Sequence, residues 1–119
     1  MTEIRLELPW PPSVNHYWRR GKGRTYISDE GRAYRDQVVL LARVASVGWT
    51  GFADGDLACR IDLYPPNRRK IDIDNRLKAL LDAMEHAGVY ADDAQIKDLR
   101  VVMHDAEKGG RCAVEVMAL

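Results

Sequence analysis

The stretch around which the rest of this chain is organised reads Asn67-Arg68-Arg69-Lys70-Ile71-Asp72-Ile73-Asp74-Asn75-Arg76-Leu77-Lys78. Three consecutive cations lead directly into two carboxylates two residues apart, and a lysine follows about one helical turn after the second carboxylate. Side chains two apart in extended backbone point to the same side, so Asp72 and Asp74 can offer oxygen ligands to one hard cation such as Mg²⁺. The stretch therefore predicts a metal site beside a segment that attracts phosphate.

The residues after this stretch predict a helix that begins near Asn75 and ends at Gly88. Its apolar residues recur at helical spacing: Leu77, Leu80, Leu81, Met84 and Ala87. Lys78 then lies about one turn from Asp74, where its ammonium can reach a phosphate that the metal also holds. In the alternative interpretation Asp74 is only the helix N-cap, and Lys78 pairs with Asp74 or Asp82.

A second basic segment lies near the start of the chain and reads Asn15-His16-Tyr17-Trp18-Arg19-Arg20-Gly21-Lys22-Gly23-Arg24. Glycine makes such an arm adaptable, aromatic faces can stack on exposed bases, and cations can contact phosphates. The alternative is a solvated basic loop whose aromatic residues pack on the domain. The candidate DNA-binding residues of the two segments are Arg19, Arg20, Lys22, Arg24, Arg68, Arg69 and Lys70.

The acidic pair Asp92-Asp93 offers a third metal-binding carboxylate. A helix from Asn75 to Ala87 is about 20 Å long, and the six residues from Gly88 to Asp93 span at most about 20 Å. Asp93 therefore reaches the first two acids only by one of three routes. The segment runs straight back beside the helix, the side chain bridges part of the gap, or the ligand comes from another subunit. An acidic loop or a cap for a following turn is the alternative.

Alternation of apolar and polar residues predicts strands at Glu3–Leu8, Thr25–Ile27, Leu57–Tyr64, Ile96–His104 and Arg111–Met117. Ser28 is the expected N-cap of a helix over residues 29–47. The last two strands are predicted to form a hairpin through the glycine-containing turn at residues 105–110. We expect an α+β fold: a single small domain over residues 1–119, with a mixed β-sheet of about four strands and two main helices.

Composition limits the other possibilities. The chain has 119 residues, 46% hydrophobic and 30% charged, with no apolar run long enough to span a membrane and no signal-peptide pattern at its start. We expect a cytoplasmic protein with no membrane partner. Cys59 and Cys112 lie in strand-like apolar sequence and are expected to be buried free thiols. The net charge is zero, which lowers the expectation of DNA binding without excluding it, because phosphate binding depends on local patches.

Four segments of the sequence together resemble the RusA family of crossover-junction endodeoxyribonucleases. They are residues 8–15 (LPWPPSVN), 26–35 (YISDEGRAYR), 68–75 (RRKIDIDN) and 87–95 (AGVYADDAQ). The resemblance covers nearly the whole chain, except that residues 46–60 match poorly. Lys70 stands where the family often has arginine.

The resemblance implies a homodimeric, Mg²⁺-dependent enzyme, with Mn²⁺ able to substitute, that resolves four-way DNA (Holliday) junctions in recombination and repair. Such enzymes are usually carried by phages or prophages, and no small-molecule cofactor is implied. Carried over position by position, Asp72, Asp74 and Asp93 would be the catalytic, metal-holding acids and Lys78 the essential base-type residue. Asn75 and Asp92 match the pattern as supporting residues.

Two other functions are compatible with these residues. One is a non-catalytic module that binds branched DNA, in which Asp72 and Asp74 are structural. The other is a metal nuclease that acts on other DNA, such as flaps or ordinary duplex.

Overall fold

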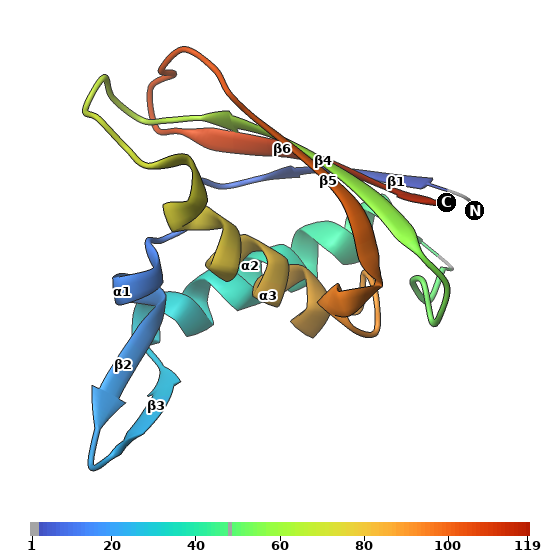
Figure 1. The fold of residues 1–119 in the computed structure, drawn as a ribbon, viewed down its shortest axis with the longest axis horizontal. Helices are drawn as coiled ribbons and strands as arrows, with labels where there is room; N and C mark the ends of the chain where they lie inside the picture. Colours follow the sequence, from blue (N-terminus) through green and yellow to red (C-terminus); the bar gives the residue numbers. More distant parts are fainter. Residues whose placement is uncertain (1–2, 48) are drawn as a thin grey trace.

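A four-stranded sheet packs with one face on two helices in this computed structural model, which describes residues 3–47 and 49–119 (Figure 1). Its strands are β1 (Glu3–Leu8), β4 (Leu57–Tyr64), β5 (Ile96–Met103) and β6 (Arg111–Ala118), in the order β1-β6-β4-β5. Strand β6 is antiparallel to both β1 and β4, whereas β5 is parallel to β4. The predicted α+β fold with a mixed four-stranded sheet and two main helices is confirmed.

The core lies between the sheet and the helices α2 (Asp29–Ala45) and α3 (Leu77–His86). Every second residue of β4 is buried, because successive side chains in a strand point to opposite faces. Helix α3 buries one stripe, formed by Ala79, Leu80, Ala83 and Met84. The helix that follows the acidic stretch is therefore firmly anchored, and its first residues are held in a fixed position.

Helix α2 begins where the sequence predicts. The Ser28 hydroxyl accepts a hydrogen bond of 2.9 Å from the Gly31 N–H, so Ser28 is the N-cap. A Cβ at Gly31 would lie only 2.6 Å from the carbonyl oxygen of Tyr17. Glycine at this position therefore allows α2 to approach the short helix α1 (Val14–Tyr17) closely.

The basic segment near the start of the chain is a β-hairpin that projects from the body of the molecule (Figure 1). Strands β2 (Trp18–Gly21) and β3 (Arg24–Ile27) form a sheet of their own. The turn residues Lys22 and Gly23 both have positive φ, as a tight hairpin turn requires. The sequence predicts a strand at Thr25–Ile27 but only an adaptable arm for residues 15–24, because a four-residue strand with two arginines carries little apolar alternation.

The predicted hairpin between the last two strands is wrong. Strand β4 lies between β5 and β6 in the sheet, and the connection from β5 to β6 crosses the end of β4. His104 N–H donates to the Leu63 carbonyl at 2.8 Å, and Glu107 N–H donates to the Pro65 carbonyl at 2.8 Å. Alternation identifies the buried face of a strand but does not identify its neighbours.

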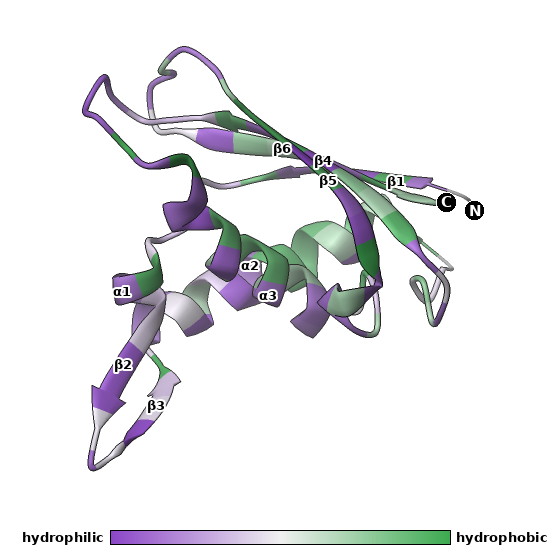
Figure 2. Cartoon of the chain, viewed as in Figure 1, coloured by the Kyte–Doolittle hydropathy of each residue, from purple (hydrophilic) through white to green (hydrophobic). Residues whose placement is uncertain are grey.

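Both cysteines are buried and free, as predicted, and burial raises the pKa of each thiol to about 12. Among the described residues, no helix combines the length and the apolar character that crossing a bilayer requires. Figure 2 shows that apolar residues gather where the sheet faces the helices, whereas the β2–β3 hairpin and the loop after β4 are largely hydrophilic.

Candidate functional site

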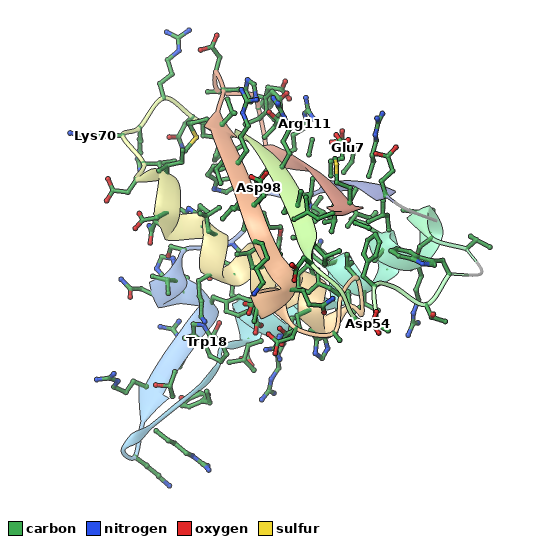
Figure 3. The ribbon with its side chains drawn as sticks, turned by 45° about the vertical axis from the view of Figure 1, so that its right-hand side comes forward. Glu7, Trp18, Asp54, Lys70, Asp98 and Arg111 are labelled. Atoms are coloured by element: carbon green, nitrogen blue, oxygen red, sulfur yellow. The ribbon has the colours of Figure 1, made fainter. Side chains whose placement is uncertain are left out.

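The loop after β4 presents its cations to solvent. Strand β4 ends at Pro65-Pro66, and the next four residues, Asn67 to Lys70, are exposed. The Asn67 side chain accepts a 2.9 Å hydrogen bond from the Arg69 N–H, which fixes the turn locally. Figure 3 shows Lys70 at the outer edge of this loop, directed away from the sheet. These cations are therefore available to an anionic ligand.

Asp72 and Asp74 are exposed, and neither carboxylate is used by the fold. Asp72 occupies the N-cap position of the 3₁₀ helix η1 (Ile73–Arg76) without a side-chain capping bond, and the N-cap of α3 is Arg76. In the described part of the chain neither acid forms a side-chain hydrogen bond or an ion pair with the protein. The structure therefore does not show the capping role considered for Asp74. Two exposed, uncommitted carboxylates are a donor set that fits a hard divalent cation.

The start of α3 is fixed by Arg76, which the sequence interpretation left without a role. Its Nη1 donates to the Pro11 carbonyl at 3.3 Å, and its guanidinium carbon lies 5.5 Å from the centre of the Trp10 ring. Burial lowers the pKa of Arg76 from its ordinary value. These contacts join residues 9–12 (PWPP) to η1 and so help to position the residues on either side of Asp74.

A partly buried polar network joins the base of the hairpin to α3. The Tyr17 hydroxyl donates a hydrogen bond to Asp82, and the Arg35 Nη2 atom lies 2.7 Å from the Asp82 Oδ2 atom. Burial is the main reason why the pKa of Tyr17 is raised, and its bond to Asp82 adds to the effect. Asp82 therefore pairs with Arg35 and not with Lys78. The sequence gives only a weak signal for this network: Arg35 and Asp82 are charged residues that stand among apolar residues of their helices.

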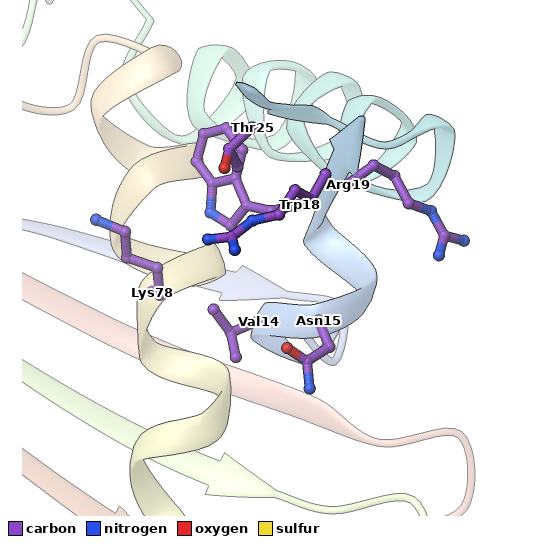
Figure 4. Close-up of a pocket in the computed structure, with 7 residues that line it drawn as sticks. Val14, Asn15, Trp18, Arg19, Thr25 and Lys78 are labelled. Atoms are coloured by element: carbon purple, nitrogen blue, oxygen red, sulfur yellow. The ribbon is translucent and has the colours of Figure 1, made fainter. Parts of the chain in front are cut away.

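Lys78 faces an open pocket of about 760 Å³ between α3 and the hairpin (Figure 4). It forms no ion pair with any residue that the structure describes. The other residues that line the pocket come from α1, β2 and β3: Val14, Asn15, Trp18, Arg19, Arg20 and Thr25. The pocket thus places Lys78 of α3 beside residues of α1, β2 and β3, a juxtaposition that the sequence order does not reveal.

Asp92 and Asp93 lie at the opposite end of α3. The Asp93 N–H donates a 2.7 Å hydrogen bond to the Glu85 carboxylate, and Asp92 accepts a 2.8 Å bond from the Ala94 N–H. Asp92 is thus the cap of the 3₁₀ helix η2 (Asp93–Gln95), the structural role that the sequence left open. One carboxylate oxygen from each of Glu85, Asp92 and Asp93 lies within 4.8 Å of the others, the only such acidic group in the described residues. Sequence reasoning gave Glu85 no part in it.

The structure does not bring Asp93 to Asp72 and Asp74 within one chain. The part of α3 between the two groups, residues 77 to 85, is about 12 Å long at 1.5 Å per residue, and among the described residues neither Asp72 nor Asp74 belongs to an acidic group that includes Asp93. The chain after α3 does not run back beside the helix. Instead, Phe52 N–H donates to the Val89 carbonyl at 2.9 Å, and Ala91 N–H donates to the Phe52 carbonyl at 3.2 Å. Of the three routes considered for Asp93, a straight return beside α3 is excluded.

Comparisons with known proteins assign the chain to a family. The model of the family "Endodeoxyribonuclease RusA" matches residues 9–117. The chain is 44% identical over 116 residues to the crossover junction endodeoxyribonuclease RusA of Shigella sonnei, covering 98% of this chain and 95% of that protein. It is 43% identical, with the same coverage, to the proteins of that name from Escherichia coli K12 and from Enterobacteria phage 82.

Proposed function

This chain belongs to the RusA family of endodeoxyribonucleases, and we propose from this membership that residues 1–119 act as one junction-resolving nuclease domain. The substrate is a four-way (Holliday) DNA junction, and the reaction is paired hydrolysis of phosphodiester bonds in recombination and repair. The observation that carries the proposal is the pair of exposed, uncommitted carboxylates of Asp72 and Asp74 at η1, just before α3. They are close in sequence to Lys78 and to the exposed cations after β4.

The proposed cofactor is Mg²⁺, with Mn²⁺ able to substitute, held by Asp72, Asp74 and Asp93. When bound, the ion supplies a water of lowered pKa and offsets the charge that develops on the phosphate. Lys78 contributes an ammonium that attracts the phosphate and stabilises its added negative charge. Asp92 supports the site by capping η2, the turn that carries Asp93. Asn75 is proposed as a supporting residue of the metal site because it follows Asp74 directly in η1.

The proposed assembly is a homodimer in which the acids of one subunit meet the partner subunit's Asp93. Two oxygens bound to one Mg²⁺ lie at most about 4.2 Å apart, since each Mg–O distance is about 2.1 Å. The length of α3 between the two acidic groups, about 12 Å, is about three times larger, and the segment after α3 pairs with Phe52. A four-way junction has two-fold symmetry and needs two opposed cuts, so a C2 dimer with two such sites fits both requirements.

The proposed DNA contacts are made by the two basic segments. Arg19, Arg20, Lys22 and Arg24 belong to the projecting hairpin, and Arg68, Arg69 and Lys70 belong to the loop after β4. All seven side chains are exposed. Contacts of this kind go mainly to phosphates, so affinity should fall steeply with salt while selectivity for branched DNA comes from shape.

The decisive experiment compares cutting of a four-way junction, a linear duplex and a splayed duplex at equal salt with Mg²⁺. We expect paired cuts in the junction alone, and an Asp72→Asn variant should bind the junction normally but leave it uncut. Normal cutting by this variant would contradict the metal-site proposal. Binding without any cutting by the unsubstituted protein would favour the non-catalytic module, and equal cutting of all three substrates would favour a nuclease of other specificity.

A further inference from the structure

The pocket between the hairpin and α3 has the chemistry of a nucleotide-binding site. Its volume of about 760 Å³ lies within the usual range for small-molecule sites. Three of its lining side chains are cations, namely Arg19, Arg20 and Lys78, and the described residues that line it include no acid. It therefore favours a ligand with negative charge.

The Trp18 indole gives the pocket an aromatic wall that is already held in place (Figure 4). Its ring lies edge-on to the Tyr17 ring with centroids 5.2 Å apart, and the Arg35 guanidinium carbon lies 5.9 Å from its centroid. Tyr17 and Arg35 are themselves fixed by Asp82. A ring held in this way loses little conformational freedom when a base stacks on it.

Asn15 adds a group that can read a base edge. Its side chain is exposed on α1, lines the pocket and forms no hydrogen bond with the described residues. An amide offers one acceptor and two donors, the combination that pairs with base edges in nucleic-acid complexes. A groove that only followed the phosphates of a duplex would need neither this amide nor an indole.

We propose that this pocket binds one unstacked nucleotide of the branched DNA, with its base on Trp18, its base edge at Asn15 and its phosphate between Lys78 and one arginine of β2. The inference rests on the proposed function and extends it to the selection of the cutting position. Lys78 follows Asp74 by four residues and is shared by the pocket and the proposed catalytic set, so the bound nucleotide lies next to the phosphate that is cut. A base at the crossover of a junction can leave its stack at lower cost than a base within a duplex.

Binding is best measured in an Asp72→Asn background, so that Mg²⁺ can be present without cutting. Two junctions are compared, one intact and one with an abasic site at the nucleotide that flanks the cut. Trp18→Leu should weaken binding of the intact junction between about fivefold and about 150-fold, the usual range for loss of one base stack. Trp18→Phe, which keeps a stacking ring, should lose much less. Trp49→Leu, at a half-buried indole outside the pocket, is the matched control and should bind as the background protein does.

The abasic junction separates stacking from a structural role of the indole. The Trp18→Leu variant and its background should bind the abasic junction equally, because the base that stacks is absent. In a protein with Asp72 intact, Asn15→Ala should also change the preferred nucleotide at the cut. If Trp18→Leu weakens binding of both junctions alike, or of neither, the inference is overturned while the proposed function stands. If the unsubstituted protein shows no preference for junction over duplex, the proposed function itself fails, and this inference with it.

Discussion

Two inactive variants, Asp72→Asn and Asp93→Asn, should restore junction cutting when their subunits are mixed. In one chain the acids before α3 and the Glu85–Asp93 group lie at opposite ends of residues 77 to 85, a helical length of about 12 Å. One Mg²⁺ spans at most about 4.2 Å between two ligand oxygens. If the site uses all three acids, we expect Asp93 to come from a partner subunit. In a mixed dimer, one of the two sites then lacks both acids and the other is intact.

The size of the recovery follows from counting sites. Random exchange of two equally abundant subunits makes about half of the dimers mixed, and each mixed dimer holds one intact site. The mixture should therefore show about a quarter of the wild-type rate of single-strand nicking, with few paired cuts, because no dimer contains two intact sites. A junction labelled on two opposite strands separates nicks from paired cuts on a denaturing gel.

The matched control is a mixture of Asp72→Asn with Asp74→Asn. These two acids lie in one segment of the same subunit, so both sites of a mixed dimer stay broken and no activity should return. Subunit exchange is confirmed separately by native mass spectrometry of the two variants. Absence of nicking in the Asp72/Asp93 mixture, with exchange demonstrated, would refute the shared site.

Three further predictions concern stability and DNA affinity. Gly51→Ala should lower the free energy of unfolding by at least about 3 kcal/mol, because its Cβ would lie 1.9 Å from a backbone oxygen and its φ is +92°. Gly55→Ala, with φ +87° but open space around it, should cost only about 1 kcal/mol in the same denaturation experiment, and equal losses would contradict the close-contact argument. A hydrogen bond from Arg60 lowers the pKa of Asp62 from its ordinary value of 3.8. The ionised Asp62 carboxylate therefore stabilises the folded state above that ordinary value, and this contribution is lost as the pH falls through the lowered pKa. Asp62→Asn should therefore flatten the decline of the denaturation midpoint below about pH 4, and an unchanged decline would count against this ion pair. Arg69→Gln should weaken binding to junction and duplex alike and reduce the slope of log affinity against log salt by about one; a loss confined to the junction would show that Arg69 does more than contact a phosphate.

Much of this protein is determined locally in its sequence. Alternation in Leu57–Tyr64 gives a strand, the 3.6-residue spacing after Asn75 gives a helix, and Ser28 gives a helix start, because each depends on neighbours within a few residues. The pair Asp72 and Asp74 can also be recognised from sequence as a candidate metal site, since these two acids and Lys78 lie within seven residues of one another. These local patterns were sufficient for the fold class and for the first half of the candidate site.

Other features depend on which segments pack together, and only the tertiary structure decided them. Periodicity shows that a strand or helix has an apolar face, but it does not show which element covers that face. For this reason the predicted hairpin of β5 and β6 is wrong, and the alternative in which Lys78 pairs with Asp82 does not hold, because Asp82 binds Arg35. The same limit applied to Asp93, which packs beside Glu85 at the far end of α3, and to Trp18, which shares a pocket with Lys78. Contacts between residues this far apart in sequence arise from the packing of the whole chain, and no short segment encodes them.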